Sequence, residues 1–165
     1  MVLAAQPEGE LAADEIRLSA CGTGMPAARH GQAATCWLVE LGNGDKFLFD
    51  IGTGSSERIS AMKIPYDYLD KVFIGHLHAD HFGDLDALWI GGWLSGRYTP
   101  LHIYGPSGSK PELGTAAFVE GLKKTYAWDV SGRAGILPDA GGPAAQFVFT
   151  GPDGSVVPAE RADAK

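Results

Sequence analysis

The stretch KVFIGHLHADHFGD, residues 71–84, decides how the rest of the chain is interpreted. It opens with a short apolar and β-branched run at 71–75, which predicts a buried strand. The strand leads directly into a polar cluster at 76–81, and Asp84 is suited to begin a helix over 85–94 as its N-cap. The sequence therefore predicts a group of polar side chains at the end of a strand, where the chain turns into a helix.

Three of the five histidines of the chain fall within this cluster, together with one aspartate, and packing alone does not explain such a spacing. The four side chains are His76, His78, Asp80 and His81. In extended backbone, His76 and His78 point the same way, so they can bind one divalent ion. Asp80 and His81 lie at the turn and are placed for a second ion, as in sites where two metals clamp a displacement reaction. Histidine and carboxylate suit zinc, manganese and iron alike, and we expect two ions with zinc as the first choice.

The sequence on both sides of the cluster also indicates secondary structure. Strands come first along the chain, and helices lie between the later strands. Pro65 ends the first helix, and Gly42, Asn43 and Gly44 favour a tight hairpin. Beyond Trp128 the pattern loosens, with one strand and a hairpin at 152–155. The expected strands are 16–21, 34–41, 46–50, 71–75, 101–105 and 146–150, and the expected helices are 52–63, 85–94 and 111–126.

Length and composition fit one globular domain of 165 residues with 45% hydrophobic and 20% charged residues. No apolar run approaches the ~18 residues of a membrane span, so we expect no membrane partner. The net charge of −7 disfavours nucleic acid as a partner. The acidic leader at 1–14 lacks the features of a signal peptide, which leaves a cytoplasmic location and a periplasmic or secreted one after signal removal both open. Cys21 and Cys36 match no metal spacing and are interpreted as buried thiols.

Residues 73–84 resemble the signature metal motif of the metallo-β-lactamase-fold hydrolases. Residues 47–54, FLFDIGTG, resemble the upstream strand that ends in the aspartate of that family. The resemblance covers about residues 16–108. Within it, 21–26 and 101–108 are similar to the branch that holds tRNA 3′-end processing endonucleases, arylsulfatase-like enzymes and cyclic-nucleotide phosphodiesterases.

This resemblance implies an α/β (α+β) fold, half of an αββα sandwich, with a mixed sheet and flanking helices. It implies that His76 and His78 bind the first zinc and that Asp80 and His81 bind the second, with Asp80 also the residue assigned a catalytic role. Asp50 would orient the ligand loop without binding metal. The diiron flavoprotein branch has glutamate where this chain has His78, which disfavours oxygen or nitric oxide reduction.

The family completes its site with a third histidine, a bridging carboxylate and a last histidine far downstream, whereas this chain has no histidine after His102. We therefore expect residues 15–165 to be the N-terminal half of such a domain. The expected partner is the C-terminal half, from the same precursor or from a second chain, with a homo-oligomer as a further alternative. We expect the isolated chain to be inactive.

The function expected from these residues is hydrolysis of an ester, lactone or phosphodiester by a metal-bound hydroxide, with a small molecule as substrate. One alternative is an endonuclease of the tRNA 3′-end processing type. The other is a non-catalytic metal-binding half that requires a partner chain. Two features have two interpretations each. Asp84 either caps a helix or orients a histidine. Trp89 and Trp93 either form a core stripe, an apolar face of the helix packed in the core, or line the mouth of a substrate pocket.

Overall fold

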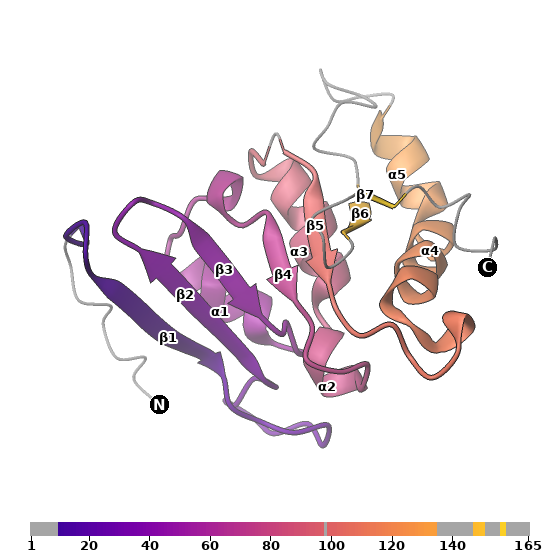
Figure 1. Ribbon diagram of the computed structural model, residues 1–165, viewed down its shortest axis with the longest axis horizontal. Helices are drawn as coiled ribbons and strands as arrows, with labels where there is room; N and C mark the ends of the chain where they lie inside the picture. The colour runs from indigo at the N-terminus through magenta and orange to yellow at the C-terminus, as the bar shows by residue number, and fades with distance from the viewer. Residues whose placement is uncertain (1–9, 98, 135–146, 151–155, 158–165) are drawn as a thin grey trace.

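A mixed seven-stranded sheet forms the centre of the computed structural model, which describes residues 10–97, 99–134, 147–150 and 156–157 (Figure 1). Its strands lie side by side in chain order. The first three are antiparallel, β3 to β6 are parallel, and the last pair is antiparallel. The strands are β1 (Ile16–Gly22), β2 (Cys36–Leu41), β3 (Lys46–Phe49), β4 (Lys71–Phe73), β5 (Leu101–Tyr104), β6 (Phe147–Thr150) and β7 (Val156–Val157). The expected mixed sheet is confirmed.

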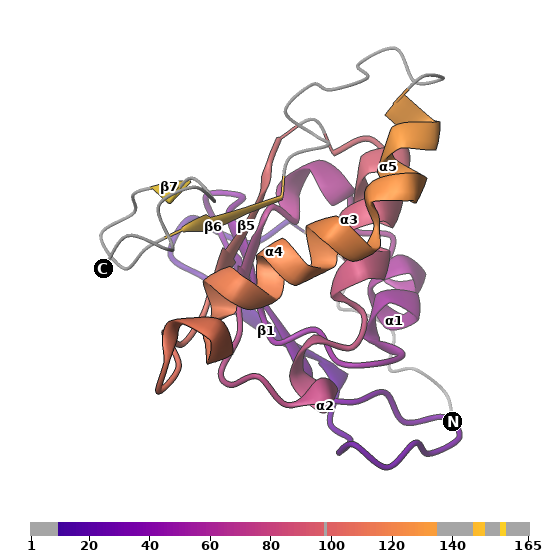
Figure 2. The ribbon, with the colours of Figure 1, turned by 90° about the vertical axis from the view of Figure 1, so that its right-hand side faces the viewer.

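Helices cover one face of this sheet, as Figure 2 shows for α1, α3 and α4. The helices are α1 (Ser55–Ala61), α2 (Ala79–Phe82), α3 (Leu85–Leu94), α4 (Thr115–Thr125) and α5 (Ala127–Ala134), with 3₁₀ turns η1 (Tyr66–Tyr68) and η2 (Pro111–Leu113). The helix expected at 111–126 starts as η2 and becomes α-helical only at Thr115, whose N–H and hydroxyl both donate to the carbonyl of Pro106. The sequence did not predict α5, because Gly132 and a β-branched residue weaken its helical signal.

Strand residues alternate between the two faces of the sheet, as the period of two requires. Leu38, Leu48, Val72 and Ile103 are fully buried between the sheet and the helices, where they pack with Leu85, Leu88, Ile59 and Val119. Trp89 and Trp93 of α3 are 2% and 7% exposed, so the interpretation as a core stripe is confirmed. No helix in the described part of the chain is both long and apolar enough to span a membrane.

The opposite face of the sheet, here called the outer face, is apolar and uncovered by the labelled helices (Figure 2). Ile16 and Leu18 of β1 are 69% and 62% exposed, and the exposed Trp37 of β2 pairs with Phe49 of β3. A row of stacked rings then crosses the sheet, with Phe73 at 5.2 Å from Phe49 and 4.5 Å from Tyr104 between ring centroids. The outer face therefore has the composition of a surface that is normally covered.

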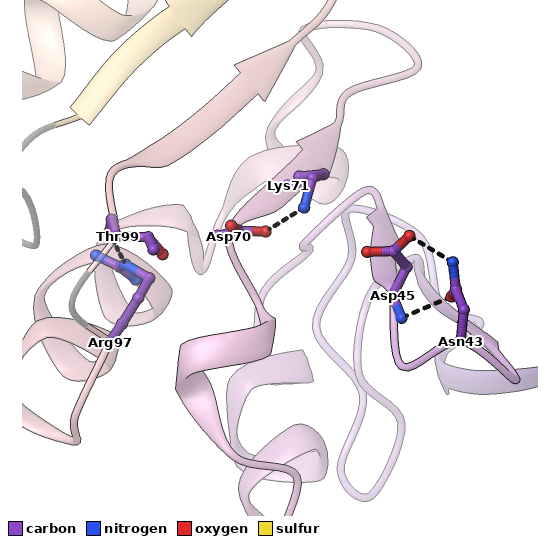
Figure 3. Close-up of polar contacts among 6 residues, drawn as sticks. All are labelled: Asn43, Asp45, Asp70, Lys71, Arg97 and Thr99. Atoms are coloured by element: carbon purple, nitrogen blue, oxygen red, sulfur yellow. Dashed lines mark hydrogen bonds and ion pairs between the residues drawn. The ribbon is translucent and has the colours of Figure 1, made fainter.

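Polar contacts secure the end of the sheet where β4 and β5 begin (Figure 3). Lys71 contacts Asp70 at 2.7 Å, and Asn43 and Asp45 close the β2–β3 turn with hydrogen bonds of 2.9 and 3.0 Å. The buried guanidinium of Arg97 donates to the carbonyls of Thr99, Leu88 and Trp89, and burial lowers the pKa of Arg97 to about 10. The other end of the sheet, where β3, β4 and β5 finish, carries the polar cluster.

Candidate metal centre

Asp50 and the histidine cluster meet because they follow two adjacent parallel strands. Phe49 of β3 is in register with Phe73 of β4, so the segments that follow these two strands leave the sheet at the same edge. Asp50 still donates its N–H to the carbonyl of Phe73 at 2.9 Å, and its φ of 61° then turns the backbone away. Aspartate is one of the few residues other than glycine that adopts this left-handed conformation readily.

The carboxylate of Asp50 holds His81 and the start of the cluster at once. Its Oδ2 lies 2.7 Å from Nδ1 of His81, and its Oδ1 accepts a hydrogen bond of 2.8 Å from the N–H of Gly75. A carboxylate only accepts, so the neutral imidazole of His81 carries its proton on Nδ1. The other ring nitrogen, Nε2, keeps its lone pair and lies 3.7 Å from Oδ2 of Asp80.

The remaining histidines join the same group. Nε2 of His76 lies 3.0 Å from Nδ1 of His78, and the His76 ring centroid lies 3.8 Å from that of His81. The strand expected at 71–75 ends earlier, at Phe73, so both histidines stand on the irregular segment that follows β4. All five residues singled out in the sequence are therefore brought together at one edge of the sheet. Of the two other histidines, His30 lies in a loop, and His102 lies in β5, within the strand expected at 101–105.

The donor set fits divalent metal ions. Two nitrogens on one tetrahedral zinc lie about 3.3 Å apart, which follows from Zn–N distances of about 2.0–2.1 Å, and the His76–His78 separation is close to this. Oδ1 of Asp80 is buried and has no hydrogen-bond partner among the described residues, a costly state that a cation would relieve. Within the described ranges, no three His, Cys, Asp or Glu side chains already form a metal-binding group. The described residues thus offer two ligand pairs.

Backbone contacts bind the cluster to the loop after β3. The N–H of Ile51 donates to the carbonyl of His81 at 2.8 Å, and the carbonyl of Ile51 accepts from the N–H of Asp84 at 3.0 Å. Gly52 and Gly83 allow this approach, because a Cβ on Gly52 would overlap the carbonyl of Asp80 and one on Gly83 would overlap the Thr53 hydroxyl.

Asp84 is the N-cap residue of α3, as expected from its position, but its carboxylate neither caps that helix nor contacts a histidine among the described residues. Its Oδ2 instead accepts a 2.9 Å hydrogen bond from the N–H of Ser56 in the first turn of α1. Asp84 therefore joins the end of the metal motif to the helix that follows Asp50. No local pattern in the sequence indicates this contact, because the two residues are 28 positions apart.

The two cysteines are buried next to each other on β1 and β2, as expected. The thiol of Cys36 donates to Cys21, which raises the pKa of Cys36, as does its burial, and lowers the pKa of Cys21. These thiols belong to the core rather than to the polar cluster.

Comparison with known proteins identifies the family of the chain. Residues 16–127 match the family model described as Anti-Pycsar protein Apyc1. The chain is 33% identical over 121 residues to Ribonuclease Z of Mycolicibacterium gilvum (strain PYR-GCK) and 31% identical over 144 residues to Ribonuclease Z of Mycobacterium marinum (strain ATCC BAA-535 / M). These alignments cover 72% and 86% of this chain but only 40% and 49% of the relatives, so the chain spans less than half of their length.

Solved structures show the same fold. The chain matches human tRNase Z, short form, with a TM-score of 0.59 at 21% identity, over 81% of this chain and 44% of that one. It matches the metallo-β-lactamase-fold protein YhfI of Bacillus subtilis with a TM-score of 0.50 at 26% identity, over 58% of this chain and 40% of that one. The family model spans more than half of the chain and includes the whole polar cluster. The chain belongs to the Anti-Pycsar protein Apyc1 family, and its Ribonuclease Z relatives identify it as a metallo-β-lactamase-fold metallohydrolase of the tRNase Z branch.

Proposed function

We propose that this protein is part of a metal-dependent phosphodiesterase that cleaves RNA, with the 3′ end of a tRNA precursor as its substrate. The observation that carries the proposal is the convergence of Asp50, His76, His78, Asp80 and His81 at one edge of the sheet. Relatives named Ribonuclease Z align over 72% and 86% of the chain, which favours a phosphodiester over a carboxylic ester or a lactone.

Two pairs of side chains hold the metals in this proposal. His76 and His78 bind one ion, Asp80 and His81 bind the other, and zinc is preferred over manganese or iron. Two such ions supply a water of lowered pKa and neutralise charge on the phosphoryl oxygens. Asp50 contributes by orientation: it fixes the tautomer and the ring direction of His81, so that Nε2 faces Asp80.

A second candidate substrate is a small phosphodiester such as a cyclic nucleotide, because residues 21–26 and 101–108 resemble a branch that includes cyclic-nucleotide phosphodiesterases. The observation that favours it is the net charge of −7, because an RNA-binding surface gains most of its affinity from positive charge. RNA binding by this protein would need a local concentration of positive charge.

The site is completed by a further polypeptide segment in this proposal. The outer face carries Trp37, Phe49, Phe73 and Tyr104, and leaving such a patch in water is unfavourable. A second sheet, the C-terminal half of the same fold, packs on this face and supplies the ligands that the two pairs lack. It comes from the same precursor or from a second chain, and residues 15–165 alone are inactive.

The test combines metal analysis with hydrolysis. The protein, alone and together with a polypeptide that supplies the C-terminal half of the fold, is loaded with zinc and given a 3′-extended tRNA precursor and bis(p-nitrophenyl) phosphate in parallel. Cleavage of the tRNA precursor at its 3′ end supports the first candidate, and turnover of the small diester alone supports the second. Metal binding without hydrolysis of either would instead indicate a non-catalytic metal-binding half. His30→Ala, in the exposed loop, is the control for loss of any histidine.

A further inference from the structure

A cleft of about 410 Å³ opens beside Asp80, between the loop that follows β1 and the start of α1. Residues from three separate segments form its walls, and Asp80 is where it meets the candidate metal centre. The polar side chains that line it include Arg29, Gln32, Thr53, Glu57 and Arg58. The cleft is therefore a partly polar space next to the proposed reaction centre, and the metal ligands themselves do not fill it.

Two guanidinium groups in this cleft have donors to spare. Nη2 of Arg58 donates to the carbonyl of Gly31 at 2.8 Å, which uses one of five N–H donors and also holds the loop against α1. Nη2 of Arg29 contacts only the Met25 sulfur, at 3.8 Å, as far as the described residues show. A thioether is a weak acceptor, so the charge of Arg29 is not matched by this contact.

Three acids, Asp80, Asp84 and Glu57, line the cleft beside its two arginines, so an anion would be held there by guanidinium donors and not by a net positive charge. Asp84 accepts from the Ser56 amide, and Asp80 faces His81. Glu57, which lies next to Arg58 on α1, is one of these acids and weakens the attraction of the cleft for an anion. Planar guanidinium groups bind phosphate oxygens through paired N–H donors, which makes phosphate the matching ligand.

We propose that Arg29 and Arg58 form a phosphate-binding subsite, which takes the phosphate next to the one that is cleaved. The subsite rests on the proposed function for the identity of its substrate, a chain with at least two phosphates. Binding of phosphate itself needs only residues of this chain. A polyanionic substrate would thus be held by the paired donors of two guanidinium groups although the cleft and the chain are both acidic overall.

The test is a titration of the metal-free ¹⁵N-labelled protein with inorganic phosphate, and separately with the 5′-phosphorylated dinucleotide pUpU, at low salt. The amides of Gly31 and Gly54, in the cleft wall, are expected to shift with both probes. Arg29→Gln should weaken binding about 3- to 10-fold, the range of a charge-assisted hydrogen bond reduced by solvent screening. Glu57→Gln should strengthen it. Arg133→Gln, which removes the same charge from α5, is the matched control and should change nothing.

Equal losses for Arg29→Gln and Arg133→Gln, or shifts confined to residues outside the cleft, would overturn the subsite. Arg58→Lys keeps the charge but loses the paired donors, so wild-type affinity in that variant would also count against it. With the metal-loaded enzyme, hydrolysis of RNA that is unaffected by Arg29→Gln would leave the proposed function standing and remove the subsite. If phosphate binds in the cleft but the protein hydrolyses no diester, the subsite stands and the proposed function is refuted.

Discussion

Replacing Asp50 by asparagine tests how the candidate metal centre is held in place. The wild-type carboxylate accepts two hydrogen bonds, from Nδ1 of His81 at 2.7 Å and from the N–H of Gly75 at 2.8 Å. Asparagine has the same shape and tolerates the φ of 61°, so the backbone need not change. It offers one acceptor oxygen, however, and its NH₂ group must then face either Gly75 or His81.

If the NH₂ group faces His81, the ring must carry its proton on Nε2, and that nitrogen can no longer bind metal. If it faces Gly75, an amide donor opposes an amide donor. Loss of one hydrogen bond to a charged group is worth about 1.5–3 kcal/mol, and loss of such an orienting partner lowers metal affinity or activity by about 10- to 100-fold. We therefore expect Asp50→Asn to weaken zinc binding within this range.

Zinc affinity is measured by competition with a chromophoric chelator, and the His81 tautomer by long-range ¹H–¹⁵N correlation spectra. Asp45→Asn is the matched control, since it makes the same substitution in the β2–β3 turn at the far end of the sheet. Wild-type zinc affinity and activity in Asp50→Asn would refute the orienting role. A loss as complete as that of a ligand would refute it too, because Asp50 would then act as a ligand.

Three further outcomes are expected. Alanine at any of the proposed ligands should remove metal and activity together, and full metal content by mass spectrometry in His76→Ala and His81→Ala would contradict this. Leu48→Ala empties a fully buried position and should lower the free energy of unfolding by about 2–5 kcal/mol in urea, whereas Leu18→Ala on the outer face should not. A hydrogen bond to Asp86 raises the pKa of Tyr126 to about 12. Folding thus favours the protonated phenol, so this contribution to stability is present below pH 10 and is lost as pH rises toward 12. Unfolding curves of Tyr126→Phe at these pH values should lack this contribution.

Local signals in the sequence predict the elements that carry the site. The helix expected at 85–94 is α3 (Leu85–Leu94), and the expected strands lie within a residue or two of β1 to β6. These elements are predictable because their patterns depend on consecutive residues. The strands show alternating apolar and polar residues, and α3 shows Asp84 followed by a long apolar run. The grouping of the histidines follows from the same local pattern.

Contacts between segments distant in the chain could not be predicted in this way. Asp84 binds the amide of Ser56, and Arg58 binds the carbonyl of Gly31, across 28 and 27 positions. Neither partner is a side chain, so no residue type marks it in the sequence. The cleft with its two arginines is created by these contacts and becomes visible only once the three segments are assembled.

At Asp50, the local sequence predicts one feature of the residue, and contacts with a distant segment determine another. Its position at the end of an apolar run predicts a carboxylate at a strand end, whereas its left-handed backbone depends on the neighbouring strand. Its N–H must still pair with Phe73 while its side chain turns back to Gly75 and His81, and a φ of 61° meets both demands. Such a conformation costs about 1–3 kcal/mol in a residue other than glycine, and less in aspartate than in most. Glycine would remove that cost but also both hydrogen bonds, so the strain is retained because the carboxylate is what joins β3 to the metal motif.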